Sequence, residues 1–415
     1  MNGTRFPGIL LALLACGACT RERTELRLHA SRLETPAAPG SGEPNLAVAP
    51  GGRVLLSWIE AAGEKRHSLR YAARAGAGAW SRPETIATGP GWFVNWADFP
   101  SLAGLQDGTL FAHWLARTGE AAYAYDVRVT ASGDGGKTWS APVTPHRDGT
   151  QTEHGFVSMV PAGGQAMGLV WLDGRKTSGL GHEGHAGQAA GQAEMSLLHS
   201  TIDREGRLGH ETALDGRVCD CCQTDAAVAE GATVVVYRDR SENEVRDISV
   251  VRLVDGKWSE PRPLARDGWE ISGCPVNGPA VAAGGTRVAA AWFTAAHGQS
   301  RVNLAFSVDA GATFGPPIVI DDGRPLGRVD VVLVAQGVAL VSWLEQAQRG
   351  TELRVRSVSP DGTRGEALAV ADASSARSSG FPRMVASGSE VIVAWRDAAE
   401  PPNVRTAVRT WSGSD

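Results

Sequence analysis

Seven similar segments recur along the chain, and their spacing constrains the fold more than any other feature. Each has a glycine-containing turn, a β-branched apolar run and an aromatic residue followed by a polar one. The aromatic residues are Trp58, Trp114, Trp171, Tyr237, Trp292, Trp343 and Trp395, at intervals of 56, 57, 66, 55, 51 and 52 residues. These intervals are typical of four-stranded propeller blades with long loops. We therefore predict an all-β fold, a single β-propeller of four-stranded blades, with seven blades favoured and six as the fallback.

The two ends of this repeat series make a further prediction. The last repeat, residues 381–411, has room for only three strands. Residues 24–32 alternate apolar and polar side chains, as a strand does, and lie before the first repeat. We expect this segment to supply the missing fourth strand and close the ring, which would remove an exposed sheet edge.

The composition agrees with a β fold and excludes some partners. The chain has 51 Gly, 22 Pro and 13 Trp in 415 residues, which suits short strands and tight turns. The net charge is −5, with Lys and Arg scattered singly. Because no basic stripe is present, nucleic acid is not expected as a partner, and the folded domain is not expected to bind an anionic membrane.

The N-terminus predicts export. A short apolar run, residues 9–15, follows Arg5 and is typical of a signal peptide. Residues 13–16 read LLAC and resemble a bacterial lipobox, in which Cys16 would be lipidated; Cys19 and ordinary secretion are the alternatives. We predict a signal peptide over 1–19, a tether and possible closing strand over 20–42, and the propeller over 43–415. The expected location is the periplasm or outer surface of a bacterium, with membrane contact only through the lipid anchor.

Two turn motifs indicate the type of propeller. Residues 132–139 read SGDGGKTW and residues 307–314 read SVDAGATF, and both match the Asp-box pattern S-x-D-x-G-x-T-[WF]. On these motifs the chain resembles the sialidase-like (BNR or Asp-box) propeller superfamily from about residue 43 to residue 411. The resemblance implies that both motifs are structural hairpin turns on the outside of a blade. It assigns them no catalytic role.

Polar residues at the predicted strand ends define a candidate ligand site. In a propeller, the start of each innermost strand and the loop after the second strand reach the same face, where the central channel opens. A polar funnel there is the default binding site. The candidate ligand-binding residues are Asp98, His154, Asp173, Arg175 and Asn277.

Four cysteines occupy equivalent places in adjacent blades. Residues 217–225 read RVCDCCQTD and residues 272–279 read SGCPVNGP, each directly before a predicted innermost strand. In an extended segment, Cys219 and Cys221 would face one way and Cys222 the other. One interpretation is a disulfide between Cys274 and either Cys221 or Cys222, as expected in an oxidising compartment.

The other interpretation of the cysteines is a metal site. Thiolate and imidazole ligands select Zn or Cu, and histidines are present in the inserted loop at 179–191. The candidate metal ligands are Cys219, Cys221, Cys222, Cys274, His182 and His185, with His154 also on the preceding blade.

Comparison with the sialidase reaction leaves catalysis open. The resemblance implies three arginines for a substrate carboxylate, a tyrosine nucleophile with a carboxylate partner and an aspartic general acid. The last 178 residues contain no tyrosine, although the resemblance places the nucleophile in the last blade. If the chain is an enzyme, the candidates are Tyr237, Arg238, Asp239, Arg328, Asp330 and Arg383.

The favoured function is therefore binding. We predict an exported, lipid-anchored, sialidase-like propeller that holds a ligand, metal or partner at the channel mouth. An exo-acting glycoside hydrolase of the sialidase type, acting on anionic sugars, is the alternative. The expected partners are a carbohydrate, a metal or an envelope protein.

Overall fold

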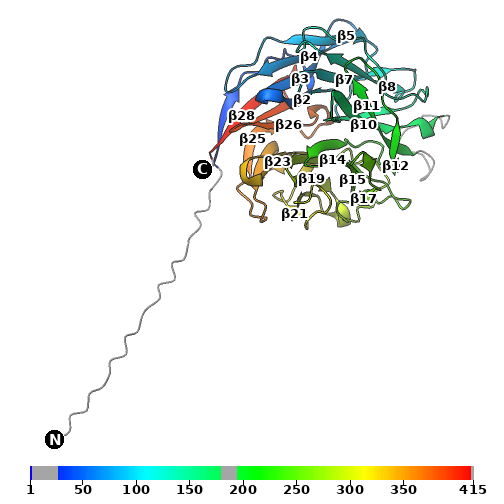
Figure 1. The fold of residues 1–415 in the computed structure, drawn as a ribbon. Helices are drawn as coiled ribbons and strands as arrows, with labels where there is room; N and C mark the ends of the chain where they lie inside the picture. The colour runs from blue at the N-terminus through cyan, green and yellow to red at the C-terminus, as the bar shows by residue number, and fades with distance from the viewer. Residues whose placement is uncertain (2–26, 179–193, 413–415) are drawn as a thin grey trace.

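The computed structural model describes residues 27–178 and 194–412, besides Met1, and within them the chain forms seven β-sheets arranged radially around one axis (Figure 1). The chain runs around the ring in order, from blue through green and yellow to red. The predicted seven-bladed all-β propeller is confirmed.

The first three blades follow one another along the chain. Blade 1 contains β2 (Gly42–Ala49), β3 (Arg53–Ala61), β4 (Arg66–Arg74) and β5 (Glu84–Pro90). Blade 2 contains β6 (Ser101–Gly104), β7 (Leu110–Arg117) and β8 (Tyr125–Ser132), and a bridge between Val129 and Val143 stands where a fourth strand would pair. Blade 3 contains β9 (His154–Pro161), β10 (Ala166–Asp173), β11 (Met195–Asp203) and β12 (Thr212–Val218).

The other four blades complete the ring. Blade 4 contains β13 (Asp225–Ala229), β14 (Ala232–Arg238) and β15 (Ile248–Val254), and β15 pairs with both β16 (Lys257–Trp258) and β17 (Arg262–Pro263). Blade 5 contains β18 (Ala280–Gly284), β19 (Arg287–Thr294), β20 (Arg301–Ser307) and β21 (Ile318–Val319). Blade 6 contains β22 (Pro325–Leu333), β23 (Ala339–Ala347), β24 (Gly350–Val358) and β25 (Leu368–Ala373). Blade 7 contains β26 (Arg383–Ser387), β27 (Glu390–Arg396), β28 (Val404–Ser412) and β1 (Arg27–Leu33).

Helical structure in the described part of the chain is limited to five single 3₁₀ turns: Pro50–Gly52, Arg175–Thr177, Ala296–Gly298, Ala335–Gly337 and Arg377–Ser379. Within these residues, no helix has the length and apolar character needed to cross a membrane.

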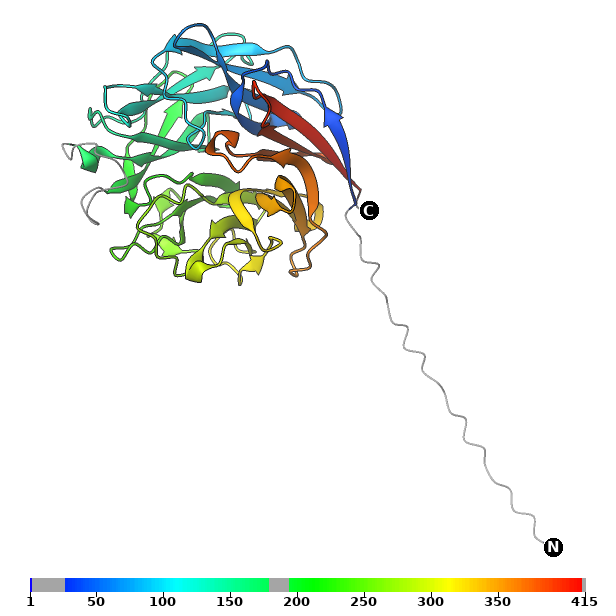
Figure 2. The same cartoon turned by 180° about the vertical axis from the view of Figure 1, so that it is seen from behind.

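Blade 7 is closed by strands from the two ends of the chain. All seven residues of β1 pair antiparallel with β28, from Arg27 opposite Ser412 to Leu33 opposite Thr406. Figures 1 and 2 show this pairing as the dark blue strand beside the red one. The edge of β28 is therefore covered by main-chain hydrogen bonds, and the ring has no open seam at this position.

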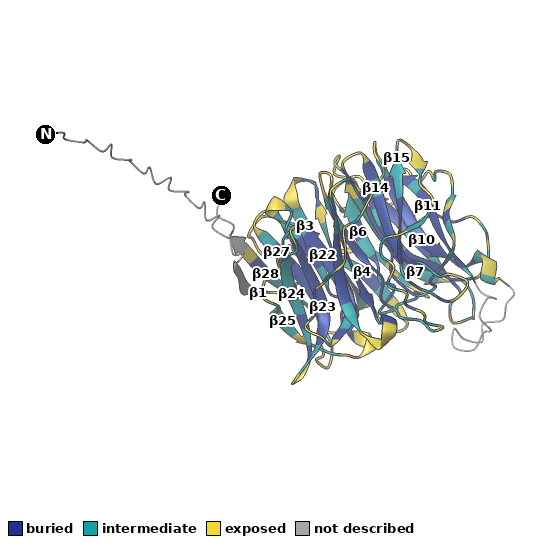
Figure 3. Cartoon of the chain, turned by 90° about the horizontal axis from the view of Figure 1, so that it is seen from below, coloured by how far each residue is buried: buried dark blue, intermediate teal, exposed yellow. Residues whose placement is uncertain are grey.

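The first strand of each blade lines the axis. The strands β2, β6, β9, β13, β18, β22 and β26 contact one another in a closed cycle. The aromatic residues of the repeat all lie on the second strand of their blade, as predicted. Five of them are completely buried: Trp58, Trp171, Tyr237, Trp292 and Trp343. Figure 3 shows buried strands inside the ring with exposed turns at its rim.

An acidic residue two positions after the tryptophan satisfies the indole in three blades. Trp58 donates to Glu60 at 2.6 Å, Trp171 to Asp173 at 2.9 Å, and Trp343 to Glu345 at 2.6 Å. A buried N–H without an acceptor would cost about 1–3 kcal/mol. These carboxylates therefore stabilise the blades in which they occur.

Both Asp-boxes form turns after the third strand of a blade. Asp134 accepts hydrogen bonds from Ser132 and from the backbone and side chain of Thr138. Asp309 makes the same contacts with Ser307 and Thr313. Asp134 and Asp309 thus hold exposed turns, in agreement with the structural role predicted for them.

Candidate metal centre beside the channel

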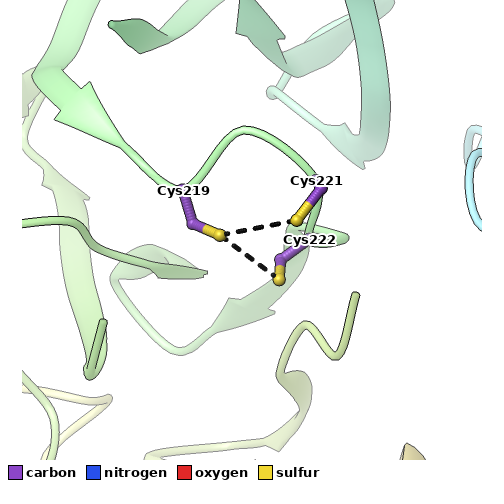
Figure 4. Close-up of side chains that lie close together, drawn as sticks. All are labelled: Cys219, Cys221 and Cys222. Carbon is purple, nitrogen blue, oxygen red and sulfur yellow. Dashed lines mark hydrogen bonds between the residues drawn. The ribbon is translucent and has the colours of Figure 1, made fainter. Parts of the chain in front are cut away.

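The loop between β12 and β13 gathers three thiols. The sulfur of Cys219 lies 3.8 Å from that of Cys221 and 3.5 Å from that of Cys222, as Figure 4 shows. The prediction that Cys222 faces away from Cys219 and Cys221 is wrong, because Asp220 and Cys221 form a turn. A turn abolishes the two-residue alternation of an extended strand, so all three sulfurs point to one side.

The fourth thiol comes from the adjacent blade. Cys274 precedes β18, and its sulfur lies 3.6 Å from Oδ1 of Asp220. One ligand atom each from Asp220, Cys221 and Cys274 lie within 4.8 Å of one another. Cys221 therefore belongs to two adjoining groups, one with Cys219 and Cys222 and one with Asp220 and Cys274, and the four thiols are free.

A buried arginine lies beside the thiols. Arg246 donates to the sulfur of Cys219 at 3.3 Å and to Asp220 at 3.2 Å. Burial raises the pKa of Cys219 to about 12. Burial also opposes ionisation of Cys222, but hydrogen bonds from Cys219 and Cys221 and the charge of Arg238 lower its pKa well below the ordinary value. The site therefore favours at least one thiolate, which is the form that binds a metal.

The geometry of the sulfurs fits a single soft cation. Thiolates bonded to tetrahedral Zn²⁺ at 2.3 Å lie about 3.8 Å apart, close to the 3.5 and 3.8 Å separations from Cys219. The backbone N–H of Asn277 donates to Cys222 at 3.4 Å, a contact that also supports a metal thiolate. Cys219 and Cys222 are buried, whereas Cys221 and Cys274 are half-buried, so a cation would reach the site from their side.

The cysteine loop adjoins the central channel. Cys222 directly precedes Gln223, which lines a partly open cavity of about 170 Å³. The polar lining of this cavity includes Asn45, Asp98, Ser158, Thr224, Asp225 and Arg383. Of the candidate ligand-binding residues, Asp98 lines this cavity, as does Arg383 from the candidate enzyme residues.

Three channel carboxylates tie neighbouring first strands together. Asp98 accepts the N–H of Phe156 at 2.8 Å, Asp225 accepts that of Val281 at 2.8 Å, and Asp330 accepts that of Met384 at 2.7 Å. In each case the acceptor belongs to one blade and the donor to the first strand of the next. These carboxylates accept hydrogen bonds from backbone N–H groups that have no partner in a neighbouring strand. This role accounts for the burial of the carboxylates.

The candidate enzyme residues Tyr237, Arg238 and Asp239 make hydrogen bonds to other parts of the protein. The Tyr237 side chain is completely buried, and its hydroxyl donates to Asp215 at 2.6 Å. Arg238 is also buried and donates to the carbonyl oxygens of Asn277, Phe293 and Arg246. Asp239 accepts a hydrogen bond from Ser249 at 3.0 Å.

The other two candidate arginines have different surroundings. Arg328 donates to the carbonyl oxygens of Ala376 and Gly380, and its backbone N–H donates to the side chain of Asn277. Arg383 lies 3.4 Å from Asp330. The guanidinium groups of Arg238, Arg328 and Arg383 thus have separate partners and do not converge on one anion-binding point.

The remaining predicted residues lie in three places. Asp173 and Arg175 pair at 2.6 Å, and Arg175 also contacts Glu211. His154 stacks on His146 rather than approaching the thiols. Cys16, His182 and His185 lie outside the described residues.

Three residues of this region, Arg246, Asp220 and Tyr125, were not predicted as site residues. Arg246 and Asp220 flank the thiols, and the only sequence signal was that Asp220 lies inside the CDCC run. Tyr125 places its hydroxyl 3.0 Å from Asp98 and 2.7 Å from Glu153. Arg246 and Tyr125 belong to no recognisable motif, so only the folded chain shows their contacts.

Comparison with known proteins gives distant structural similarity. No family model and no curated protein sequence matches the chain. Among solved structures, an α-L-arabinanase from Penicillium chrysogenum, complexed with arabinobiose, has 13% identity and a TM-score of 0.49, covering 92% of this chain and 98% of its own. The NanB sialidase from Streptococcus pneumoniae has 10% identity and a TM-score of 0.48, covering 93% and 98%. An α-L-arabinofuranosidase from Fusarium graminearum has 13% identity and a TM-score of 0.49, covering 93% and 97%.

Proposed function

We propose that this chain is an exported, membrane-tethered propeller that binds one soft cation, Zn²⁺ or Cu⁺, through Cys219, Cys221, Cys222 and Cys274. The observation that carries the proposal is the group of three free thiols, Cys219, Cys221 and Cys222, whose separations from Cys219 match a metal thiolate, with Cys274 of the next blade close to Cys221. The signal-like N-terminus and Cys16 support export and anchoring.

The surroundings of the thiols favour metal binding over inert burial. Several thiolates around one cation leave negative charge, which the charge of Arg238 opposes, while Arg246 donates to Cys219 and also pairs with Asp220 and Glu244. Backbone and side-chain donors from Asn277 and Arg246 orient two of the sulfurs. The rigid first strands β13 and β18 hold the two cysteine segments in register.

The glycoside hydrolase alternative has less support. Its best tyrosine candidate, Tyr237, is completely buried and donates its hydroxyl proton to Asp215. The three candidate arginines are engaged separately. A propeller that only binds a ligand does not need the Tyr237 hydroxyl or the three guanidinium groups to be available for catalysis.

The test is elemental analysis and thiol titration of the full chain, purified without chelators and without added reductant. We expect Cys222→Ser and Cys274→Ser each to contain about one equivalent of zinc or copper per chain less than the unsubstituted protein. The matched control is Ala226→Ser, which adds a hydroxyl to β13 of the same blade and should retain the metal. A metal-free protein with a Cys274 disulfide to Cys221 or Cys222 would overturn the proposal.

A further inference from the structure

Trp395 differs from the other aromatic residues of the repeat. The other six are buried, whereas Trp395, on β27 of blade 7, is only half-buried. In blades 1, 3 and 6 the acidic residue two positions later accepts the indole N–H, and Asp397 occupies that position in blade 7. Oδ2 of Asp397 instead accepts a hydrogen bond from Nε of Arg405 at 2.6 Å. Within the described residues, the indole N–H of Trp395 therefore has no hydrogen-bond partner.

Trp395 lines a groove between blades 6 and 7. Val370 and Ala371 of β25 form one wall, and Trp395, Arg405 and Ala407 of β27 and β28 form the other. Figures 1 and 3 show β25 beside β28. The groove has a volume of about 410 Å³, within the range of roughly 300–1,000 Å³ that is usual for ligand pockets. It shares no lining residue with the channel cavity, so it is a separate site.

The register of blade 7 explains the shape of this groove. Trp395 lies directly opposite Arg405 in the antiparallel β27–β28 pair, and residues in such positions share one face of a sheet. Ala407 and Arg409 follow on the same face of β28, because side chains alternate along a strand. Arg409 donates to the carbonyl oxygen of Ala369 in β25 at 2.7 Å, so this face is turned toward blade 6. Between Arg405 and Arg409, the small side chain of Ala407 leaves space between the two blades.

The polar groups of the groove can both donate and accept hydrogen bonds. Arg405 is 37% exposed and donates to Asp397 through Nε, and its two terminal nitrogens have no hydrogen-bond partner in the described part of the chain. Asp397 is 17% exposed. Asp372 and Glu34, which also line the groove, are exposed. Three carboxylates and one guanidinium give the groove a net negative charge, which disfavours an anionic ligand.

We propose that this groove binds an uncharged oligosaccharide, with one pyranose ring stacked on Trp395. The C–H groups of a pyranose form an apolar face, and its hydroxyl groups project from the ring edge. The indole ring matches the apolar face, whereas Arg405 and the carboxylates of Asp372 and Asp397 supply donors and acceptors for the hydroxyl groups. An apolar aromatic surface with a few polar groups around it is the usual composition of a ligand pocket.

This proposal is independent of the thiol site and of the glycosidase alternative. The thiols belong to blades 4 and 5, whereas the groove belongs to blades 6 and 7. The negative charge of the groove selects against the acidic sugars that a sialidase would need to hold. Oligosaccharide binding here requires no catalytic group.

The experiment is isothermal titration calorimetry of the full chain with defined hexasaccharides. Cellohexaose, maltohexaose and mannohexaose are the uncharged probes, and hexagalacturonate is the anionic probe. We expect at least one uncharged probe to bind, and hexagalacturonate to bind at least tenfold more weakly than that probe at low salt. Binding should be unchanged in Cys222→Ser, so failure of the metal proposal would not affect this result.

Single changes locate the binding site. Trp395→Ala should weaken binding at least tenfold, because it removes the stacking surface, whereas Trp395→Phe keeps an aromatic ring and should retain most of the affinity. Arg405→Gln should weaken binding about three- to tenfold through the loss of hydrogen bonds to hydroxyl groups. The matched control is Trp258→Ala, at a half-buried tryptophan on β16 of blade 4, which should bind as the wild type does.

Three results would overturn the proposal. They are the absence of binding by every uncharged probe, equal affinity of Trp395→Ala and the wild type, and tighter binding of hexagalacturonate than of the uncharged probes. If Trp395→Ala fails to fold, Arg405→Gln decides, because this side chain is more than one-third exposed. Unchanged affinity in Arg405→Gln would then place the sugar elsewhere on the protein.

Discussion

Arg246 donates a hydrogen bond to the sulfur of Cys219 over 3.3 Å. Cys219 follows β12 and Arg246 precedes β15, so the two residues are 27 positions apart in the sequence. The same guanidinium contacts Asp220 and Glu244 and is almost completely buried. A buried cation beside a group of thiols stabilises their ionised form. This contact therefore connects the packing of blade 4 with the proposed metal chemistry.

Replacing Arg246 tests that connection. Arg246→Met keeps most of the apolar stem and removes the charge and the donors, so we expect metal affinity at the thiol site to fall about 10–100-fold. Competition with a chromophoric chelator measures the change. Arg207→Met, at an exposed ion pair with Asp203, is the matched control. Equal affinities in both variants would show that Arg246 serves packing alone.

Gly155 is required by a close approach in the channel wall. A Cβ atom at this position would lie 2.0 Å from Oδ2 of Asp98 and 2.9 Å from the ring of Tyr125. Gly155→Ala should therefore lower the free energy of unfolding by about 1–3 kcal/mol, the usual cost of overpacking. Urea unfolding followed by tryptophan fluorescence measures it. Gly133→Ala, where the added Cβ meets nothing within 4 Å, should be close to neutral.

Asp98 should make stability depend on pH. Burial, with a smaller contribution from Glu153, raises the pKa of Asp98 from 3.8 to about 8. The folded state thus holds a proton that the unfolded state has lost, so this group's contribution favours folding at low pH and is lost as pH rises from about 4 to about 8. The slope from one such group is at most about 1.4 kcal/mol per pH unit.

The check is urea unfolding across this pH range. Asp98→Asn cannot titrate, so its free energy of unfolding should fall less steeply with rising pH than that of the wild type. Parallel curves for the two proteins would show that Asp98 is ionised in the folded state.

Closure by β1 should contribute strongly to stability. A chain starting at residue 34 lacks β1, whereas a chain starting at residue 27 keeps it, so the pair differs by this strand alone. Loss of β1 exposes the edge of β28 along the seven paired positions. We expect a lower melting temperature and concentration-dependent association for the shorter chain, measured by calorimetry and light scattering. Identical melting of the two chains would contradict a closing role.

The sequence by itself determined the architecture, because a propeller repeats a local pattern. Each blade needs an aromatic second strand and a tight turn, and those requirements recur at 51 to 66 residues, so they can be counted without coordinates. The Asp-box turns are equally local: Asp134 binds groups within four residues of itself. The same periodicity placed Cys221, Cys222 and Cys274 at equivalent points of adjacent blades.

Only the tertiary structure decided what the polar residues do. The direction of the Cys222 side chain depends on a turn that breaks strand alternation. The burial of the Asp98 carboxylate is explained by a hydrogen bond from a backbone N–H 58 positions away. His154 lies opposite His146 and Asp126 because blades 2 and 3 pack together, and no motif records that contact. Periodicity specifies which strand a residue occupies. The partners of a buried charge or imidazole depend on which loops the closed ring brings side by side, and these contacts carry most of the free energy of such a group.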